Sequence, residues 1–222
     1  MWKELIATWR SDNLLDQAWG KSYEMLDIDR AMFLEAVRVL RDTDGDPISM
    51  DIRKKDKEVN AFEREVRRKV ITHCSVQGGQ TIPSGIVLVS IVIDIERIGD
   101  YTKNILDLAE HFKQRLDGGK FEQDLQRVEV AVKDNFHRTK AAIETSDKEL
   151  TLKLLKEYEW VIPLCDKTLK QLIREKKEKL NPGEAVTLAL YFRWLKRIYA
   201  HLRNICTSVV NPVDGIGFKP EI

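Results

Sequence analysis

Hydrophobic and polar residues follow the period of about 3.6 residues that is typical of amphipathic helices along most of this chain. In one segment the apolar residues at helical spacing are Ile52, Val59, Phe62, Val66 and Val70, and in another they are Leu188, Phe192, Leu195, Ile198, Leu202 and Ile205. Turn-forming residues separate six predicted helices over residues 12–42, 47–76, 82–116, 120–144, 147–179 and 183–210. The pattern therefore predicts an all-α fold.

Residues that cap or break helices set these boundaries. Asp46 suits the N-cap of the second helix and Pro47 suits its first position. Gly118 suits a C-cap after the third helix, and Asp147 belongs to a candidate N-cap cluster before the fifth. Pro163 lies inside the fifth segment and predicts a kink there.

Residues 82–95 are ambiguous by local pattern. They are rich in β-branched residues, which also suit a buried strand. Residues 96–112, which continue the segment, have helical spacing and good helix formers. We therefore predict one long helix that is buried nearly all round in its first half.

The chain also repeats itself. Two short motifs recur at an offset of 100 residues, because Arg97-Ile98 and Asn104-Ile105 reappear as Arg197-Ile198 and Asn204-Ile205. Repetition of a multi-helix unit predicts two similar bundles related by pseudo-symmetry. We expect two antiparallel three-helix bundles, the first over residues 1–118 and the second, with a C-terminal tail, over residues 119–222.

Composition narrows the classes of function. Of the 222 residues, 43% are hydrophobic and 33% are charged, which fits long amphipathic helices and argues against disorder. The net charge of +1 gives no general attraction to nucleic acid, which usually binds a strongly basic domain or face. We therefore expect no nucleic-acid partner.

Cysteine usage and hydropathy indicate a cytoplasmic protein. Cys74, Cys165 and Cys206 are far apart and odd in number, which argues against a disulfide framework or a thiolate zinc site. The N-terminal residues contain no uncharged hydrophobic region of a secretory signal. The longest apolar run, residues 86–93, is far shorter than the roughly 20 residues that span a bilayer.

The most specific chemical pattern lies in the third predicted helix. At about 100° per residue, one face of this helix is apolar at first and acidic further along. This face consists of Ile82, Ile86, Val89 and Ile93, followed by Glu96, Asp100, Asn104 and Asp107. Because Glu96 and Asp100 are four residues apart, their charges repel unless a cation, an arginine or water compensates them. Carboxylates from facing helices suit a metal ion in a helical bundle.

The second predicted helix offers partners for the same site. Asp56, Asn60 and Glu63 flank its apolar stripe, and antiparallel packing of the two helices would bring them to Glu96 and Asp100. The alternative is a solvated acidic end of a helix, which spacing alone favours because two acids at this distance are common in helices.

A family resemblance strengthens the metal hypothesis. Residues 94–105, Asp-Ile-Glu-Arg-Ile-Gly-Asp-Tyr-Thr-Lys-Asn-Ile, resemble the signature helix of the PhoU family, Asp-Leu-Glu-Arg-Ile-Gly-Asp-His-Ala-x-Asn-Ile. The segment Asp56-Lys-Glu-Val-Asn60 is similar to the family's second acidic motif. Length, helix pattern and duplication extend the resemblance over most of the chain. It implies paired three-helix bundles whose acidic motifs bind metal clusters on the bundle surface.

By position, the resemblance implies metal ligands at Asp56, Glu96 and Asp100, with Asn60 where the family usually has aspartate. The implied cofactor is a metal ion or multinuclear cluster, with iron or zinc as the expected metal, in the first bundle alone. It also implies a cytoplasmic regulator that acts with the phosphate ABC transporter and its sensor kinase at the membrane, with no membrane span of its own and self-association as a homodimer. Such a protein restrains phosphate uptake and the phosphate-starvation response.

The second repeat departs from the family pattern. Lys196 and Ala200 occupy the positions of the two acids, and a lysine carries its own cation, so we expect no metal there. The counterpart of Asp56 is left open between Glu157 and Asp166. Residues 81–83, Thr-Ile-Pro, replace an Asp-Leu-Arg triplet of many members, which indicates a divergent member.

Three other functions remain as alternatives to this regulator, which we expect to be non-enzymatic. One is an accessory protein of a sodium-coupled phosphate transporter, because relatives of such transporters carry PhoU-like domains. Another is a metal-free helical adaptor or dimer. The third is a metal-dependent hydrolase that uses Glu96 and Asp100, although no evident general base lies near them in the sequence.

Overall fold

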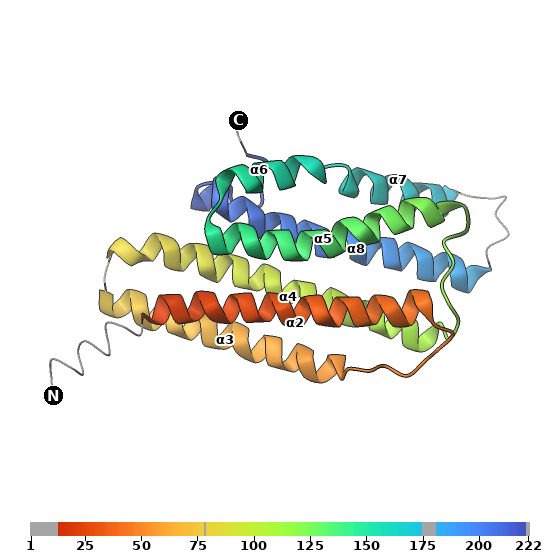
Figure 1. The fold of residues 1–222 in the computed structure, drawn as a ribbon, viewed down its shortest axis with the longest axis horizontal. Helices are drawn as coiled ribbons and strands as arrows, with labels where there is room; N and C mark the ends of the chain where they lie inside the picture. Colours follow the sequence, from red (N-terminus) through yellow and green to blue (C-terminus); the bar gives the residue numbers. More distant parts are fainter. Residues whose placement is uncertain (1–12, 78, 175–180, 221–222) are drawn as a thin grey trace.

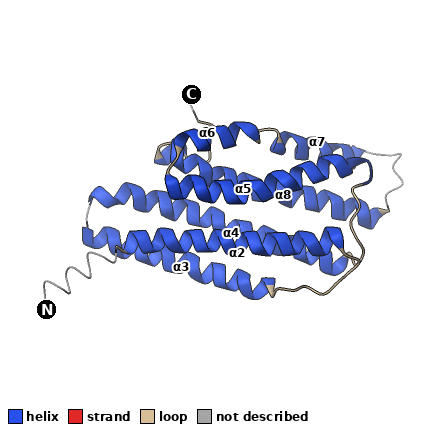
Figure 2. Cartoon of the chain, viewed as in Figure 1, coloured by secondary structure: helices blue, strands red, loops and turns tan. Residues whose placement is uncertain are grey.

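The structure is a computed structural model that describes residues 13–77, 79–174 and 181–220. Its regular structure is helical, and no strand occurs in these residues (Figure 2). The helices are α2 (Leu14–Asp42), α3 (Ile52–Gln77), α4 (Ile82–His111), α5 (Glu122–Thr145), α6 (Lys148–Glu157), α7 (Val161–Arg174) and α8 (Pro182–Val210), with short 3-10 turns η1 (Gly79–Thr81), η2 (Gly119–Phe121) and η3 (Val213–Gly215). The predicted all-α class is confirmed.

The helices form two three-helix bundles that lie side by side (Figure 1). The first contains α2, α3 and α4, and the second contains α5, α8 and the pair α6 and α7, which together replace the fifth predicted helix. Contacts of α4 with α8 and of α2 with α5 join the bundles. The predicted pair of bundles is thus confirmed, and the predicted boundary at 118/119 falls in the stretch between α4 and α5.

Side-chain caps explain where three helices begin. Asn13 accepts a hydrogen bond from the backbone N–H of Leu15 at 3.0 Å, so α2 begins at Leu14. Asp147, in the predicted cap cluster, accepts from Leu150 at 2.9 Å. Asn181 and Glu184 bond each other's backbone N–H groups and form a capping box at the start of α8.

The predicted start of the second helix at residue 47 is wrong. Residues 43–51 form a loop, and α3 begins at Ile52. Asp51 accepts a hydrogen bond from the backbone N–H of Lys54 at 2.9 Å, as an N-cap residue does, whereas the backbone N–H of Asp46 is bound by the Thr43 hydroxyl at 3.3 Å. The loop therefore satisfies its own donors, and Asp46-Pro47 starts no helix.

The predicted end of the third helix is also wrong. Helix α4 stops at His111 rather than at residue 116, and its C-cap is Phe112 rather than Gly118. The reason is tertiary, because Leu116 is fully buried and its backbone N–H donates to the carbonyl of Leu40 at 2.9 Å. This contact holds the connection between the bundles against the end of α2.

The kink predicted at Pro163 is a complete break that lies upstream of the proline. Residues 158–160 form a turn between α6 and α7, and Pro163 is in the first turn of α7. A proline there needs no backbone donor, but its ring would clash with the carbonyl of Glu159 if one helix continued through both. The break therefore has a steric cause.

The first half of α4 is less buried than predicted. Leu88, Ile91, Val92 and Ile95 are buried in the core, whereas the stripe of Ile82, Ile86 and Ile93 is exposed. The expectation of burial nearly all round was therefore wrong, and the apolar face identified in the sequence points outward. In the described part of the chain, no helix has the length and apolar character needed to cross a bilayer.

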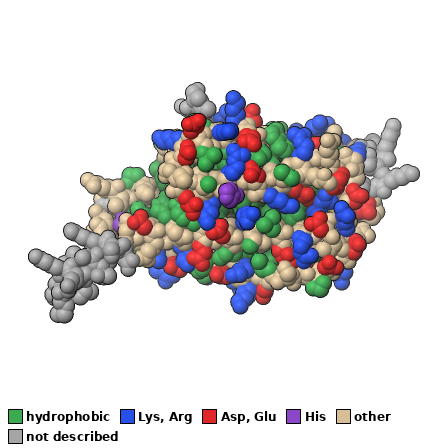
Figure 3. Space-filling view, viewed as in Figure 1, with side chains coloured by type: hydrophobic (Ala, Val, Ile, Leu, Met, Phe, Trp, Pro, Cys, Tyr) green, Lys and Arg blue, Asp and Glu red, His purple; other side chains and the backbone are tan. Residues whose placement is uncertain are grey.

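Basic and acidic side chains are mixed over the face shown in Figure 3, which spans both bundles. This face therefore shows no large area of a single charge.

Candidate functional site

The acidic end of α4 faces the start of α3. The two helices are antiparallel, because Arg53 near the start of α3 pairs with Asp107 and Glu110 near the end of α4, at 2.7 Å each. The same register brings Asp56 of α3 beside Asp100 of α4, where Lys103 Nζ bridges them at 2.9 Å and 3.1 Å. The geometric condition set by the sequence, an antiparallel helix pair, is therefore met.

Asn60 and Glu96 are the other two predicted ligands, on α3 and α4 respectively. The Asn60 side-chain nitrogen donates to the Asp56 backbone carbonyl at 3.0 Å and approaches Asp56 Oδ2 at 3.5 Å. Burial raises the pKa of Glu96, and the charges of Asp100, Glu63 and Asp56 raise it further. We call the four predicted ligands Asp56, Asn60, Glu96 and Asp100 the acidic seam.

Two cations already touch the acidic seam. Arg97 contacts Asp100 at 3.1 Å and Glu96 at 3.6 Å, but its side chain is 53% exposed and lies at the surface. Lys103 is 29% exposed and holds the oxygens of Asp56 and Asp100. Among the residues that the structure describes, no group of three or more Asp, Glu, His or Cys side chains is arranged closely enough to hold a metal ion. With Lys103 in place, its ammonium is the cation between the two helices.

A fourth acid, Asp29 of α2, packs against the same stretch of α4. Its side chain is 0% exposed, and neither carboxylate oxygen has a hydrogen-bond partner among the described residues. Asp29 Oδ1 lies so close to α4 that a Cβ built on Gly99 would be 2.9 Å away. Burial raises the pKa of Asp29 well above its ordinary value, and the charges of Asp56, Glu96 and Asp100 raise it further.

Asp29 was missed by the sequence analysis although the sequence contained a signal. The residue occupies a core position of α2, at helical spacing from the buried residues Met25, Met32, Phe33 and Ala36. Acidic residues are almost never fully buried unless they are paired. An aspartate in an apolar stripe is thus a reason to look for a site.

The second bundle has a simpler arrangement at the corresponding place. Lys196 of α8 contacts Asp166 of α7 at 2.5 Å, so Asp166 rather than Glu157 is its acidic partner. Glu157 is bound instead by Arg138 at 2.9 Å. Ala200, at the position of the second acid, adds no charge. One lysine therefore meets one carboxylate in this bundle.

A polar network between the bundles was not predicted either. His201 Nδ1 of α8 lies 2.6 Å from Asp94 Oδ1 of α4, and Asn204 donates to the same oxygen at 3.2 Å. Arg197 donates to the hydroxyl of Tyr101 at 3.2 Å and lies 3.2 Å from His201 Nε2. Because a guanidinium only donates, Nε2 accepts and Nδ1 carries the hydrogen that faces Asp94. Asp94 and His201 are 107 residues apart, so no local sequence pattern predicts their contact.

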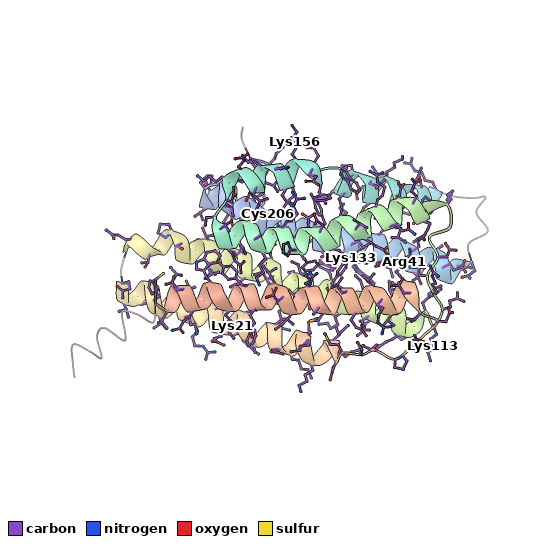
Figure 4. All side chains as sticks on the ribbon, in the orientation of Figure 1. Lys21, Arg41, Lys113, Lys133, Lys156 and Cys206 are labelled. Carbon is purple, nitrogen blue, oxygen red and sulfur yellow. The ribbon has the colours of Figure 1, made fainter. Side chains whose placement is uncertain are left out.

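A second inter-bundle network surrounds Arg41, which lies at the junction of the bundles in Figure 4. The buried guanidinium contacts Glu129 at 2.8 Å and Glu122 at 2.5 Å and donates to the carbonyl of Leu116. Tyr191 donates to Glu129 at 2.7 Å. The Glu129 carboxylate is therefore buried with both a cation and a hydroxyl, which suits a structural role.

Comparison with known proteins adds a family to this geometry. Residues 23–109 match the family model of the PhoU domain. A search of curated protein sequences finds no match.

Two solved structures share the fold. The crystal structure of PhoU from Pseudomonas aeruginosa superposes with a TM-score of 0.79 at 21% identity, over 91% of this chain and 98% of that one. The phosphate transport system regulatory protein PhoU from Streptococcus pneumoniae superposes with a TM-score of 0.75 at 15% identity, over 88% of this chain and 93% of that one. Residues 23–109 span α2 to α4 and include the whole acidic seam. The first bundle therefore matches the PhoU domain, and the chain as a whole shares the fold of these two PhoU structures.

Proposed function

We propose that this protein is a cytoplasmic regulator of phosphate transport that acts by binding partners and catalyses no reaction. The support comes from the PhoU domain at residues 23–109 and from the name of the S. pneumoniae structure, a phosphate transport system regulatory protein. The observation that carries the proposal is the acidic seam, because it lies within the matched residues and joins two helices of the first bundle.

We further propose that Asp56, Asn60, Glu96 and Asp100 hold a metal ion or cluster, with iron or zinc as the expected metal. These residues offer three carboxylates and an amide from two facing helices, which are hard ligands for a cation. The unpartnered Asp29 fits this proposal, because a buried carboxylate beside three others indicates a place that is short of positive charge. A bound metal would fix the two helices and organise the acidic surface that a partner reads.

The proposed partners are a phosphate transporter, its sensor kinase, or both, at the membrane surface. Co-purification from cells of the source organism tests this choice, with the protein cross-linked before lysis. Capture of an ABC-type phosphate transporter or its kinase supports the regulator, whereas capture of a sodium-coupled phosphate transporter supports the accessory alternative. A homodimer is tested by sedimentation of the purified protein.

The function itself is tested by phosphate physiology. In a strain that lacks the gene, we expect uncontrolled phosphate uptake and a starvation reporter that stays on in rich phosphate. Wild type should restore control, and Asp56→Asn with Asp100→Asn should not. Asp166→Asn is the matched control, because it removes the lysine-paired aspartate of the second bundle. Unchanged phosphate uptake and reporter activity in the deletion strain would refute the proposed function.

A metal-free helical adaptor is the second candidate, and one observation favours it. Lys103 already pairs with both Asp56 and Asp100 without a metal. Full physiological complementation by Asp56→Asn with Asp100→Asn would select this adaptor over the metal-dependent regulator.

A further inference from the structure

The longest uncharged stretch of the chain lies at one end of the first bundle. Residues 70–93 contain no Asp, Glu, Lys or Arg, although these residues make up 33% of the sequence. The stretch covers the end of α3, η1 and the first half of α4, which meet in a helical hairpin. In Figure 1 the end of this hairpin extends beyond the second bundle. We call residues 71–77 and 79–86 the hairpin tip.

Large aliphatic side chains are exposed at the hairpin tip. Four of them are each more than 40% exposed, namely Ile71, Val76, Ile82 and Ile86. The two helices are in close contact on their inner sides, because a Cβ built on Gly85 would lie 2.7 Å from Cys74 Sγ. The four aliphatic side chains lie outside this contact. A group of exposed apolar side chains at one place on a protein surface marks a site of interaction with a partner or a membrane.

Exposed cations adjoin the hairpin tip on α3. Arg64 and Arg68 are both exposed, and their helical spacing to Ile71 puts all three side chains on one face of α3. No ion pair of Arg64 or Arg68 occurs in the part of the chain that the structure describes. The outer face of α3 therefore changes from basic to apolar as it reaches the tip.

The acids of the same turns do not compensate these two arginines. Glu63 pairs with Arg67 at 2.7 Å, and Glu65 pairs with Lys69 at 3.1 Å. Residues 63–69 contain four cations and two acids, so they carry a net charge of +2 beside an uncharged tip. The whole chain has a net charge of only +1. Attraction to an anionic surface is therefore a local property of this end of the bundle.

An anionic lipid surface matches both features of this end. Aliphatic side chains of a peripheral protein enter the boundary between headgroups and acyl chains, about 5–10 Å deep, while adjoining Lys and Arg side chains bind anionic headgroups. At 1.5 Å per residue, Arg68 precedes Ile71 by about 4.5 Å along the axis of α3, so each kind of side chain lies at its matching depth when the tip points at the membrane. Such a contact is peripheral, because none of the described helices has the length and apolar character to cross a bilayer.

We propose that the hairpin tip docks this protein on an anionic membrane surface, with Arg64 and Arg68 bound to lipid headgroups. The proposal goes beyond the proposed function, because the ligand is the lipid itself rather than a transporter or a kinase, and no metal takes part. Docking keeps the regulator at the surface where its proposed partners lie. The acidic seam, further along the same two helices, stays away from the bilayer.

Sedimentation of the full chain with lipid vesicles at low salt tests the docking. We expect vesicles of equal parts phosphatidylcholine and phosphatidylglycerol to bind at least tenfold more tightly than vesicles of phosphatidylcholine alone, and the difference to shrink as salt rises. Ile71→Ser with Val76→Ser should weaken binding at least tenfold. Val130→Ser with Ile173→Ser is the matched control, because it removes two comparably exposed aliphatic side chains from the second bundle. It should leave binding unchanged.

The two arginines are tested apart from the aliphatic side chains. Arg64→Gln with Arg68→Gln should remove most of the preference for phosphatidylglycerol vesicles. Lys153→Gln with Lys156→Gln is the matched control, since it removes two exposed cations from α6 in the second bundle. It should keep the preference.

Three results would overturn the docking. They are a wild type that does not bind the phosphatidylglycerol vesicles, equal losses in the tip and control variants, and vesicle binding that ignores the change at Ile71 and Val76. If that last variant also lost self-association in sedimentation equilibrium, the tip would instead be a contact between two copies of the chain. The proposed function stands or falls separately, because phosphate uptake in cells tests it.

Discussion

The helix pairs α3–α4 and α7–α8 occupy equivalent places in the two bundles, but they differ in how many carboxylates meet the lysine between the helices. In the second pair, Lys196 meets Asp166 and the position of the second acid is Ala200. In the first pair, Lys103 meets two aspartates, and the carboxyl groups of Glu96 and of the buried Asp29 lie nearby. The PhoU match at residues 23–109 covers the first pair and not the second. An apolar core is common to both bundles, whereas the group of neighbouring acids on facing helices lies in the first.

Two of the buried acids, Glu129 and Asp29, also differ in how their charges are compensated. Glu129 has Arg41 at 2.8 Å and Tyr191 at 2.7 Å, so its charge is compensated inside the protein. Asp29 is buried more completely and has no hydrogen-bond partner among the described residues. Removing a partner of Glu129 would leave a buried charge uncompensated, whereas Asp29 is already a buried polar group without a partner in the described residues.

Arg41→Met should have the largest effect on stability, because it leaves the Glu129 charge buried with a hydroxyl alone. We expect the free energy of unfolding to fall by about 3–5 kcal/mol in urea denaturation. Arg53→Met is the control, since its pairs with Asp107 and Glu110 are exposed and should be worth about 1 kcal/mol or less. Equal losses in the two variants would show that the Arg41 network is not structural.

Asp29→Asn should act in the opposite direction. In chelator near pH 7, we expect it to raise the free energy of unfolding by about 1–3 kcal/mol, because it removes an uncompensated buried acid. The folded-state pKa of Asp29 is raised, so folded wild type binds the proton more tightly and loses stability as pH rises above the ordinary value of 3.8. The difference between the two proteins should therefore shrink toward pH 4. A destabilised Asp29→Asn at pH 7 would show that the carboxylate has a partner.

Gly99→Ala should destabilise the first bundle, because its methyl group would come within 2.9 Å of Asp29 Oδ1. We expect a loss of about 1–3 kcal/mol by urea denaturation. Gly20→Ala in α2 is the matched helical control, since nothing lies within 4 Å of its added Cβ. It should stabilise the protein by about 0.5–1 kcal/mol. Opposite signs in the two variants would confirm the close approach of Asp29 to α4, and equal signs would contradict it.

The smallest stability effect is expected for Lys196→Met. Its aspartate partner is 40% exposed, so the loss should be about 1 kcal/mol or less. Lys103→Met in chelator should cost more, about 1–3 kcal/mol, because it removes two charge-assisted contacts and leaves the nearly buried Asp56 without its cation. Thermal unfolding at low and high salt compares them, and a larger loss for Lys196→Met would contradict the difference drawn between the bundles.

Much of the fold could be predicted, because the helical period of the apolar residues and the internal repeat are both visible in the sequence. The ends of the helices were less predictable. Helix α4 stops at His111, and the backbone N–H of Leu116 then bonds to the carbonyl of Leu40, which is far away in sequence. The acidic seam could be expected from Asp56, Glu96 and Asp100, because the register of an antiparallel helix pair follows from a short connection.

The contact of Lys103 with Asp56 and the network between the bundles could not be predicted from the sequence, because each joins residues that only the packed helices bring together. Lys103 is 47 residues from Asp56, and only the packed helices show that its ammonium reaches across. His201 is 107 residues from Asp94, and the pair exists only because the bundles dock through α4 and α8. Asp29, in contrast, could have been recognised as an acid in an apolar stripe.

Anomalous X-ray diffraction from wild-type crystals grown with Zn²⁺ tests most directly whether the acidic seam of the first bundle binds a metal. We predict an anomalous peak within ligand distance of Asp56 and Asp100 and no peak at Asp166. Crystals at saturating Zn²⁺ with no anomalous peak in the first bundle, and with Lys103 still bridging Asp56 and Asp100, would contradict the proposed metal site.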